Sequence, residues 1–225
     1  MKSIYFFGNE KTDGSAKLKR LLGGKGANLA EISNLKIPVP PGFTITTKIC
    51  NYYLKHKQFP KNFQSQLFKA LGQIEKIMGT SFGSDSNPLL VSVRSGAQVS
   101  MPGMMETVLN VGLNDSTAIG LIKKTNNERF VYDSYRRLIM MYSDVVLDSE
   151  KTNRLRETME ACLQKYKKQK NISNDSDLSS TDFKSLIKQF KLIVNKKLNM
   201  NFPESPKEQI LNAVIAVFNS WNGAR

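Results

Sequence analysis

Cysteine is scarce in this sequence, which contains only Cys50 and Cys162. The two residues lie far apart and follow neither the spacing of a metal site nor that of a redox pair. A disulfide framework needs more cysteines, and a structural zinc site needs them in closely spaced pairs. We therefore expect two reduced thiols and assign no metal ligand to this chain.

Histidine is scarcer still, because His56 is the only one. It lies in the sequence YLKHKQ, on a lysine-rich stretch with helical spacing, and no Asp, Ser or Cys stands at a catalytic spacing from it. A histidine that transfers protons needs such a partner to orient it. We assign no catalytic role to His56.

The sequence also lacks an uninterrupted apolar run near the length of a bilayer crossing, although 40% of its 225 residues are hydrophobic. Its first residues, MKSIYFFGNEKTDG, meet charge too early for a signal peptide. We expect a soluble, cytoplasmic protein with enough apolar residues for one large domain or two small ones.

Acidic residues are few. The sequence has 19 Asp and Glu but 33 Lys and Arg, which gives a net charge of +14. Such a charge attracts anionic partners, and nucleic acid has to be considered. The lysines are however spread along the chain, without an aromatic stacking pattern or a known nucleic-acid motif. Solvated helix faces are the favoured explanation.

The order of elements predicts an α/β (α+β) protein. Short strands are expected at Ile4 to Phe7, Phe43 to Thr46 and Leu89 to Arg94, with helices at Ala27 to Leu35, from Thr47 to Pro60 and from Phe63 to Met78. Helices alone follow, at Asp115 to Lys123, Asn127 to Tyr142, Thr152 to Gln169, Asp182 to Leu198 and Pro206 to Ser220. This order suggests an α/β subdomain over 1–112, a helical subdomain over 113–200, and a last helix in 201–225 that returns to the first.

The first candidate for chemistry is Lys25, which stands among three glycines in LGGKGANLAE, ahead of a predicted helix. Glycines let backbone N–H groups approach a polyphosphate, and the start of a helix favours the same anion. The spacing is not that of a Walker loop. A tight turn with a solvent-facing lysine is the alternative.

The second candidate is Arg94, which ends an apolar strand and precedes Ser95 and Gly96. Its guanidinium can hold two phosphate oxygens at once. The alternative is an arginine that forms a salt bridge at the end of its strand. The following loop, Ser100 to Met105 (SMPGMM), offers methionines that could cover a nucleotide or could equally be buried.

Arg136 and Arg137 form a third basic site, in the predicted helix YDSYRRLIMMY. Asp133 stands four residues before Arg137, the spacing of a helical ion pair. Structural pairing or a docking surface is the favoured interpretation, and a lid-side phosphate contact is the alternative.

Five segments together resemble the amino-terminal nucleotide-binding region of the pyruvate, phosphate dikinases. They are LGGKGANLAEI, PVPPGFTITT, VSVRSGAQVSMPGMMETVLNVGLND, RFVYDSYRRLIMMYSDVV and FNSWNGAR. The resemblance implies the first lobe of an ATP-grasp fold with a helical-bundle insertion. It also implies an enzyme that interconverts ATP, phosphate and pyruvate with AMP, diphosphate and phosphoenolpyruvate, with Mg²⁺ as cofactor.

By the same resemblance, Lys25 and Arg94 match the residues that hold the ATP phosphates, and Gly103, Met104 and Thr107 lie in the matching nucleotide loop. The family members are much longer. The acidic metal ligands of the second lobe, the domain of the carrier histidine and the pyruvate-binding barrel are therefore expected outside this chain. We accordingly expect a truncated chain, inactive alone, with those domains as partners and a homo-oligomeric full-length enzyme.

Two alternative functions remain at this point. A phosphoenolpyruvate synthase would share the Gly-Lys and Val-Arg-Ser patterns, but the Met-Pro-Gly-Met-Met string favours the dikinases. A basic nucleic-acid-binding or regulatory module without catalysis would account for the charge of +14.

Overall fold

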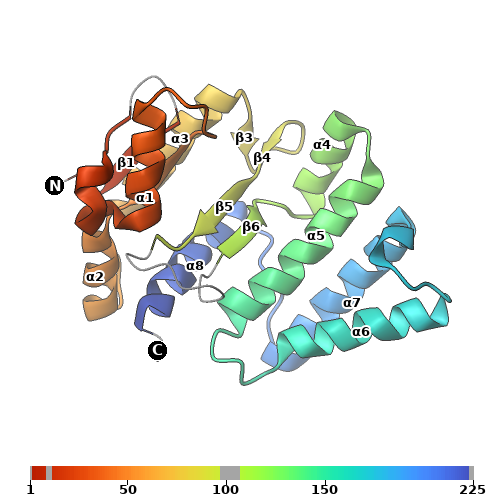
Figure 1. Cartoon of the computed structure of the whole chain (residues 1–225). Helices are drawn as coiled ribbons and strands as arrows, with labels where there is room; N and C mark the ends of the chain where they lie inside the picture. The colour runs from red at the N-terminus through yellow and green to blue at the C-terminus, as the bar shows by residue number, and fades with distance from the viewer. Residues whose placement is uncertain (1, 9–11, 97–106, 223–225) are drawn as a thin grey trace. The chain divides into compact units, whose positions relative to one another are not determined.

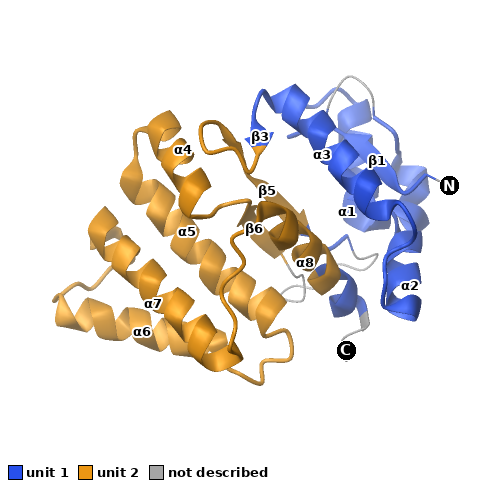
Figure 2. Cartoon of the chain, turned by 180° about the vertical axis from the view of Figure 1, so that it is seen from behind, with its two compact units in different colours: residues 1–81, 94–106, 217–225 blue, residues 82–93, 107–216 orange. Residues whose placement is uncertain are grey.

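The computed structural model of the protein describes residues 2–8, 12–96 and 107–222. It combines helices with short strands, which confirms the predicted α+β class. The chain divides into two compact units, coloured in Figure 2. Unit 1 comprises residues 1–81, 94–106 and 217–225, and unit 2 comprises residues 82–93 and 107–216. The chain therefore passes from one unit to the other more than once.

The described part of unit 1 contains an antiparallel pair of strands and three helices (Figure 1). In chain order these elements are β1 (Ile4–Phe7), α1 (Lys19–Asn34), β2 (Gly42–Ile45), α2 (Thr47–His56) and α3 (Phe63–Met78). The register places Ile4 opposite Ile45 and Phe7 opposite Gly42. The predicted strands and the predicted start of α2 are confirmed.

Helix α3 forms much of the core of unit 1. Its apolar side chains recur at helical spacing, and Phe63, Leu67 and Ile74 are buried. The helix ends at Gly79, which adopts the left-handed conformation with φ 62°. Both the apolar face and the stop are as the sequence predicts.

Helix α1 begins earlier than predicted. The sequence places a loop before a helix that starts at Ala27, but the chain is already helical from Lys19, and only Gly23 departs from helical geometry. The helix resumes at once, so Lys25 lies within it and not in a preceding loop. Glycine is a poor helix former alone, and packing of this segment in the folded unit overrides that preference.

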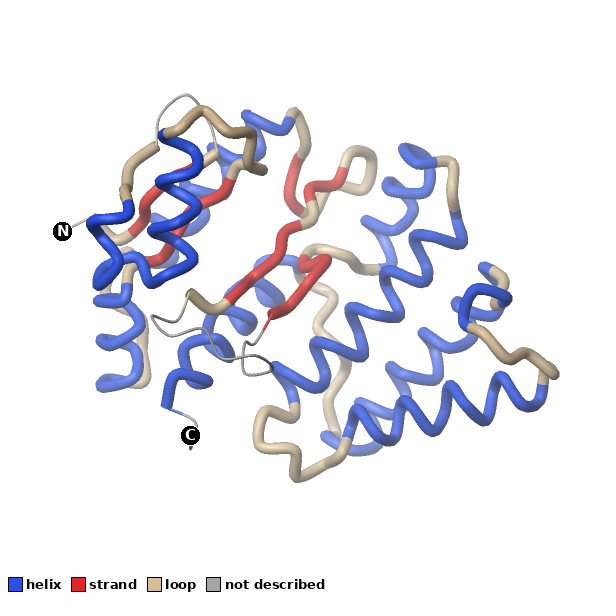
Figure 3. The backbone as a smooth tube through the Cα atoms, in the orientation of Figure 1, coloured by secondary structure: helices blue, strands red, loops and turns tan. Residues whose placement is uncertain are grey.

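Unit 2 consists mainly of helices with a few short strands, which Figure 3 shows in red. Its described elements are β4 (Pro88–Leu89), β5 (Val91–Arg94), β6 (Thr107–Val111), α4 (Asp115–Thr125), α5 (Glu128–Tyr142), α6 (Leu155–Gln169), α7 (Ser180–Leu198) and α8 (Pro206–Asn219). β4 pairs with β3 (Ser81–Phe82), and β5 pairs with β6. Arg94, at the end of β5, and the last turn of α8 belong to unit 1.

Helix starts in unit 2 follow local capping signals. Asn114 and Thr117 form a capping box at α4, and the Glu208 N–H donates to Ser205 Oγ (3.4 Å) ahead of α8. Helix α6 begins at Leu155 and not at Thr152. The carboxylate of Asp148 accepts the backbone N–H of Leu155 (3.0 Å), which fixes the preceding residues in a turn.

None of the helices within the described ranges is long and apolar enough to cross a membrane. This agrees with the early charge and the short apolar runs of the sequence.

The start of α7 should make unit 2 sensitive to acid. Asp182 is buried, and its carboxylate accepts hydrogen bonds from Ser179 (2.6 Å to Oγ) and Tyr166 (2.9 Å), which hold the pKa of Asp182 well below its usual range. A lowered pKa means that this stabilisation is complete above the unfolded-state pKa of about 4 and is lost as the pH falls below it. We expect Asp182→Asn to cost about 1–3 kcal/mol of unfolding free energy at neutral pH.

Urea unfolding between pH 7 and pH 2 measures this effect. Asp182→Asn should lose less stability on acidification than the wild type, while the exposed Asp85→Asn should behave like the wild type. Equal acid sensitivity of the wild type and Asp182→Asn would contradict the assignment.

Candidate functional site

The Gly-Lys and Val-Arg-Ser segments meet in unit 1 through the backbones of two glycines. A Cβ built on Gly23 would lie 1.7 Å from the carbonyl oxygen of Gly96. The two backbone segments are therefore in contact at Gly23, with no room for a side chain there. The dihedral angles of Gly23, φ 71° and ψ 171°, fall in a region essentially restricted to glycine. This contact brings together segments that are more than seventy residues apart in the sequence.

Lys25 lies in the first turn of the helical segment that resumes after Gly23, and it is half-buried. The neighbouring Gly26 packs against strand β2, because a Cβ there would lie 2.7 Å from both Oγ1 and Cγ2 of Thr44. The glycines of this segment therefore serve different purposes. Gly23 bends the chain, and Gly26 lets the helix approach the strand.

Arg94 ends β5 and is exposed, and the next two residues are fixed on both sides. Ser95 is only 4% exposed, and its Oγ accepts a hydrogen bond from Nε1 of Trp221 at 3.1 Å. Gly96 follows, against Gly23. The backbone immediately after Arg94 is thus held by both a side chain and a neighbouring main chain.

Trp221 reaches Ser95 from the short helical turn Ser220–Asn222 at the end of α8. The preceding Phe218 is buried and packs against the rings of Tyr53 and Phe59, with centroid distances of 5.8 and 6.3 Å. The polar contact of Trp221 is made by its indole N–H, and the spacing of residues along the sequence does not reveal it.

Lys25 and Arg94 have no acidic partner in the described part of the chain, where every ion pair involves other residues. The alternative of a salt bridge at the end of β5 therefore finds no support among those residues.

The remaining predicted site residues are Gly103, Met104 and Thr107. Gly103 and Met104 lie outside the described residues, as does the Ser100 to Met105 loop. Thr107 is the first residue of β6, half-buried, and belongs to unit 2. Their roles in nucleotide binding stay predictions.

His56 and Cys50 are two further reactive side chains of unit 1. His56 is exposed at the end of α2, with its ring 4.3 Å from that of Tyr52. Burial raises the pKa of the Cys50 thiol to about 12, so this cysteine stays protonated at neutral pH. Within the described ranges, no three His, Cys, Asp or Glu side chains come together as a metal site.

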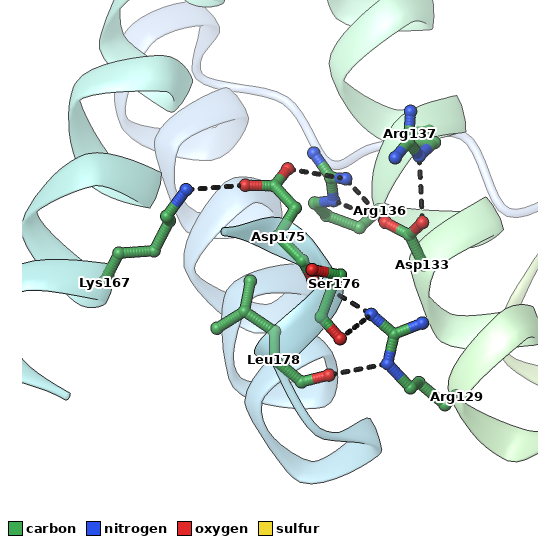
Figure 4. Close-up of polar contacts among 8 residues, drawn as sticks. All are labelled: Arg129, Asp133, Arg136, Arg137, Lys167, Asp175, Ser176 and Leu178. Carbon is green, nitrogen blue, oxygen red and sulfur yellow. Dashed lines mark hydrogen bonds and ion pairs between the residues drawn. The ribbon is translucent and has the colours of Figure 1, made fainter. Parts of the chain in front are cut away.

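The predicted pair of Arg137 with Asp133 is confirmed, with 2.9 Å between Nε and the carboxylate (Figure 4). Arg136, only 4% exposed, bonds the same carboxylate and also lies 3.5 Å from that of Asp175. Lys167 binds the other oxygen of Asp175 at 2.9 Å. These charges are used within unit 2, which supports the structural interpretation of the two arginines.

Arg129 extends this network to the connection between α6 and α7. Its guanidinium donates to the backbone carbonyls of Asp175, Ser176 and Leu178, at 2.9, 2.7 and 2.8 Å (Figure 4). A side chain of α5 thus holds the backbone carbonyls of this connection, and Leu178 is buried.

Comparison with known proteins identifies one group of relatives. The family described as "Pyruvate phosphate dikinase, AMP/ATP-binding domain" matches residues 19–62, which include Lys25. The pyruvate, phosphate dikinase of Clostridium symbiosum is 47% identical over 215 residues, which cover 95% of this chain and 24% of the relative.

Two further relatives match the full length of this chain. The Rickettsia conorii pyruvate, phosphate dikinase is 46% identical over 225 residues, and the chloroplastic pyruvate, phosphate dikinase 1 of Arabidopsis thaliana is 43% identical. The chain spans about a quarter of the length of these relatives, at 25% and 23%. The resemblance to pyruvate, phosphate dikinases thus extends along the whole chain.

The contact between Gly23 and Gly96 can be tested by adding one methyl group. We expect Gly23→Ala to cost at least about 2 kcal/mol of unfolding free energy, because alanine avoids this conformation and its Cβ would collide with a backbone carbonyl. Thermal unfolding followed by the fluorescence of the single tryptophan, Trp221, measures the change.

Gly72→Ala is the matched control. Gly72 lies inside α3, and the nearest atom to a Cβ there is 3.5 Å away, so alanine should leave stability unchanged or raise it by about 0.5–1 kcal/mol. Equal stability of Gly23→Ala and the wild type would show that the close approach does not exist.

Proposed function

We propose that this chain binds the phosphates of ATP through Lys25 and Arg94, as the amino-terminal nucleotide-binding part of a pyruvate, phosphate dikinase. The observation that carries the proposal is the contact of Gly23 with Gly96, which brings the segments of Lys25 and Arg94 together in unit 1. The full-length similarity to dikinases supports the same conclusion from the sequence.

The chemistry of the two segments suits a polyphosphate. A helix that resumes after a non-helical residue begins with amide groups that lack partners in their own segment, and such amides attract anions. Lys25 adds a full positive charge in that turn. Arg94 adds a planar group with paired donors, which matches the oxygens of a phosphate.

The charge of unit 1 favours the approach of such a ligand. By sequence, unit 1 contains 15 Lys and Arg and 5 Asp and Glu, so its net charge is 15 − 5 = +10, whereas unit 2 has 18 − 14 = +4. Within unit 1, Lys2 forms an ion pair with Asp13. An excess of unpaired cations raises the local concentration of a polyanion such as ATP.

The finer parts of the proposal follow from the relatives. We place unit 1 in the first lobe of an ATP-grasp fold, in an enzyme that interconverts ATP, phosphate and pyruvate with AMP, diphosphate and phosphoenolpyruvate. About three quarters of each relative's length lies outside the match. We assign the phosphoryl-carrying histidine and the acidic ligands of Mg²⁺ to that part, because the described residues of this chain offer no metal site.

The role of the two cations in this proposal is to bind and orient the phosphates of ATP. Positive groups fixed beside a phosphoryl group stabilise the charge that it carries during transfer. On this basis the chain alone binds ATP, and turnover requires the rest of a dikinase.

Isothermal titration of the 225-residue chain with ATP tests the proposal. We expect Lys25→Gln and Arg94→Gln each to weaken ATP binding on the order of ten- to a hundred-fold, because each removes a charged hydrogen-bond donor to phosphate. Inorganic triphosphate should compete with ATP, and adenosine should compete poorly.

Lys36→Gln is the control for the loss of one positive charge. Lys36 is exposed and lies just beyond the carboxyl-terminal end of α1, away from Lys25. Removal of its charge should leave ATP affinity within about twofold of the wild type. Undetectable binding of ATP by the wild type, or binding that survives both Lys25→Gln and Arg94→Gln, would contradict the proposal.

A further inference from the structure

The hydrogen bond between Trp221 and Ser95 lies directly beside the proposed phosphate ligand Arg94. Three consecutive residues have three different surroundings. Arg94 is exposed, Ser95 is buried and accepts the indole N–H at 3.1 Å, and Gly96 lies against Gly23. A buried serine with a defined donor fixes the backbone from which the arginine side chain extends.

We propose that Ser95 and Trp221 are positioning residues that aim Arg94 at the phosphates of a bound nucleotide. The inference rests on the proposed function and adds to it a hydrogen bond between residues 126 positions apart in the sequence. Neither residue needs to touch the nucleotide.

An arginine in water has many conformations, and each one lost on binding lowers affinity. Fixing the backbone at its base removes part of this cost before the ligand arrives. The contact with Gly23 restrains Gly96 from one side. Because neither glycine has a side chain, this contact does not set the direction of the residues before Gly96. The directional restraint comes from the hydrogen bond at Ser95.

Trp221 can act in this way because it is itself firmly held. Phe218, three residues earlier, is buried against the rings of Tyr53 and Phe59. Ser220 Oγ donates to the carbonyl of Val217 at 2.8 Å, which fixes the turn that carries the indole. The indole N–H is therefore presented to Ser95 from a packed aromatic cluster of unit 1.

Ser95→Ala and Trp221→Phe remove the acceptor and the donor in turn, while an aromatic ring is kept at position 221. We expect each to weaken ATP binding by about fivefold in isothermal titration, the effect of one ordinary hydrogen bond. The double variant should be no weaker than either single variant, because both changes remove the same bond.

The Arg94→Gln background separates positioning from a general effect on the fold. If Ser95 acts through Arg94, then Ser95→Ala should weaken ATP binding in the wild type but not in the Arg94→Gln chain. Thermal unfolding of each variant identifies any loss of folded protein. A fivefold further loss from Ser95→Ala in the Arg94→Gln chain would overturn the inference.

The fluorescence of Trp221 supplies an independent readout, since it is the only tryptophan in the sequence. The indole is excited at a wavelength that ATP does not absorb. Addition of ATP or inorganic triphosphate should change the emission of Trp221, and the midpoint of this change should equal the midpoint of the calorimetric titration. The change should disappear in Arg94→Gln. An emission unaffected by saturating ATP in the wild type would contradict the coupling.

The two proposals fail in different ways. Wild-type ATP affinity in Arg94→Gln and Lys25→Gln would overturn the proposed function and this inference with it. Loss of affinity in those two variants, with wild-type affinity in Ser95→Ala and Trp221→Phe, would overturn only the positioning role.

Discussion

The close approach of Gly23 to Gly96 is the contact on which the proposed site depends. It requires a backbone conformation that only glycine readily adopts, and it leaves no space for a Cβ beside the Gly96 carbonyl. The helical segment of Lys25 begins on one side of this contact, and the strand that ends at Arg94 leads into the other. The contact thereby brings the segments of the two cations together within unit 1.

The two units use their charges differently. Eleven ion pairs lie within unit 2, including those of the buried Arg136 with Asp133 and Asp175. There the arginines hold α5 to the connection between α6 and α7. Unit 1 has the larger net charge, +10 against +4 for unit 2. On the proposed function, the positive charge of unit 1 attracts an anionic ligand to the unit that contains Lys25 and Arg94.

The sequence predicted most elements because their signals are local. Helical periodicity in α3 and the Ser205 and Pro206 start of α8 need no distant partner. The early start of α1 could not be predicted from glycines that disfavour a helix, because the close packing of Gly26 on Thr44 appears only in the folded unit. For the site, Lys25 and Arg94 could be selected by residue type. The hydrogen bond from Trp221 to Ser95 could not, since it depends on how chain segments 126 residues apart fold together.

Amide chemical-shift mapping of the 225-residue chain during titration with ATP tests the central claim, that the two segments form one phosphate site. The account predicts that the amides of residues 23–27 and 94–96 shift together, with one midpoint, and that inorganic triphosphate reproduces their shifts. Shifts confined to one of the two segments, or centred on a different part of unit 1 such as α3, would contradict it.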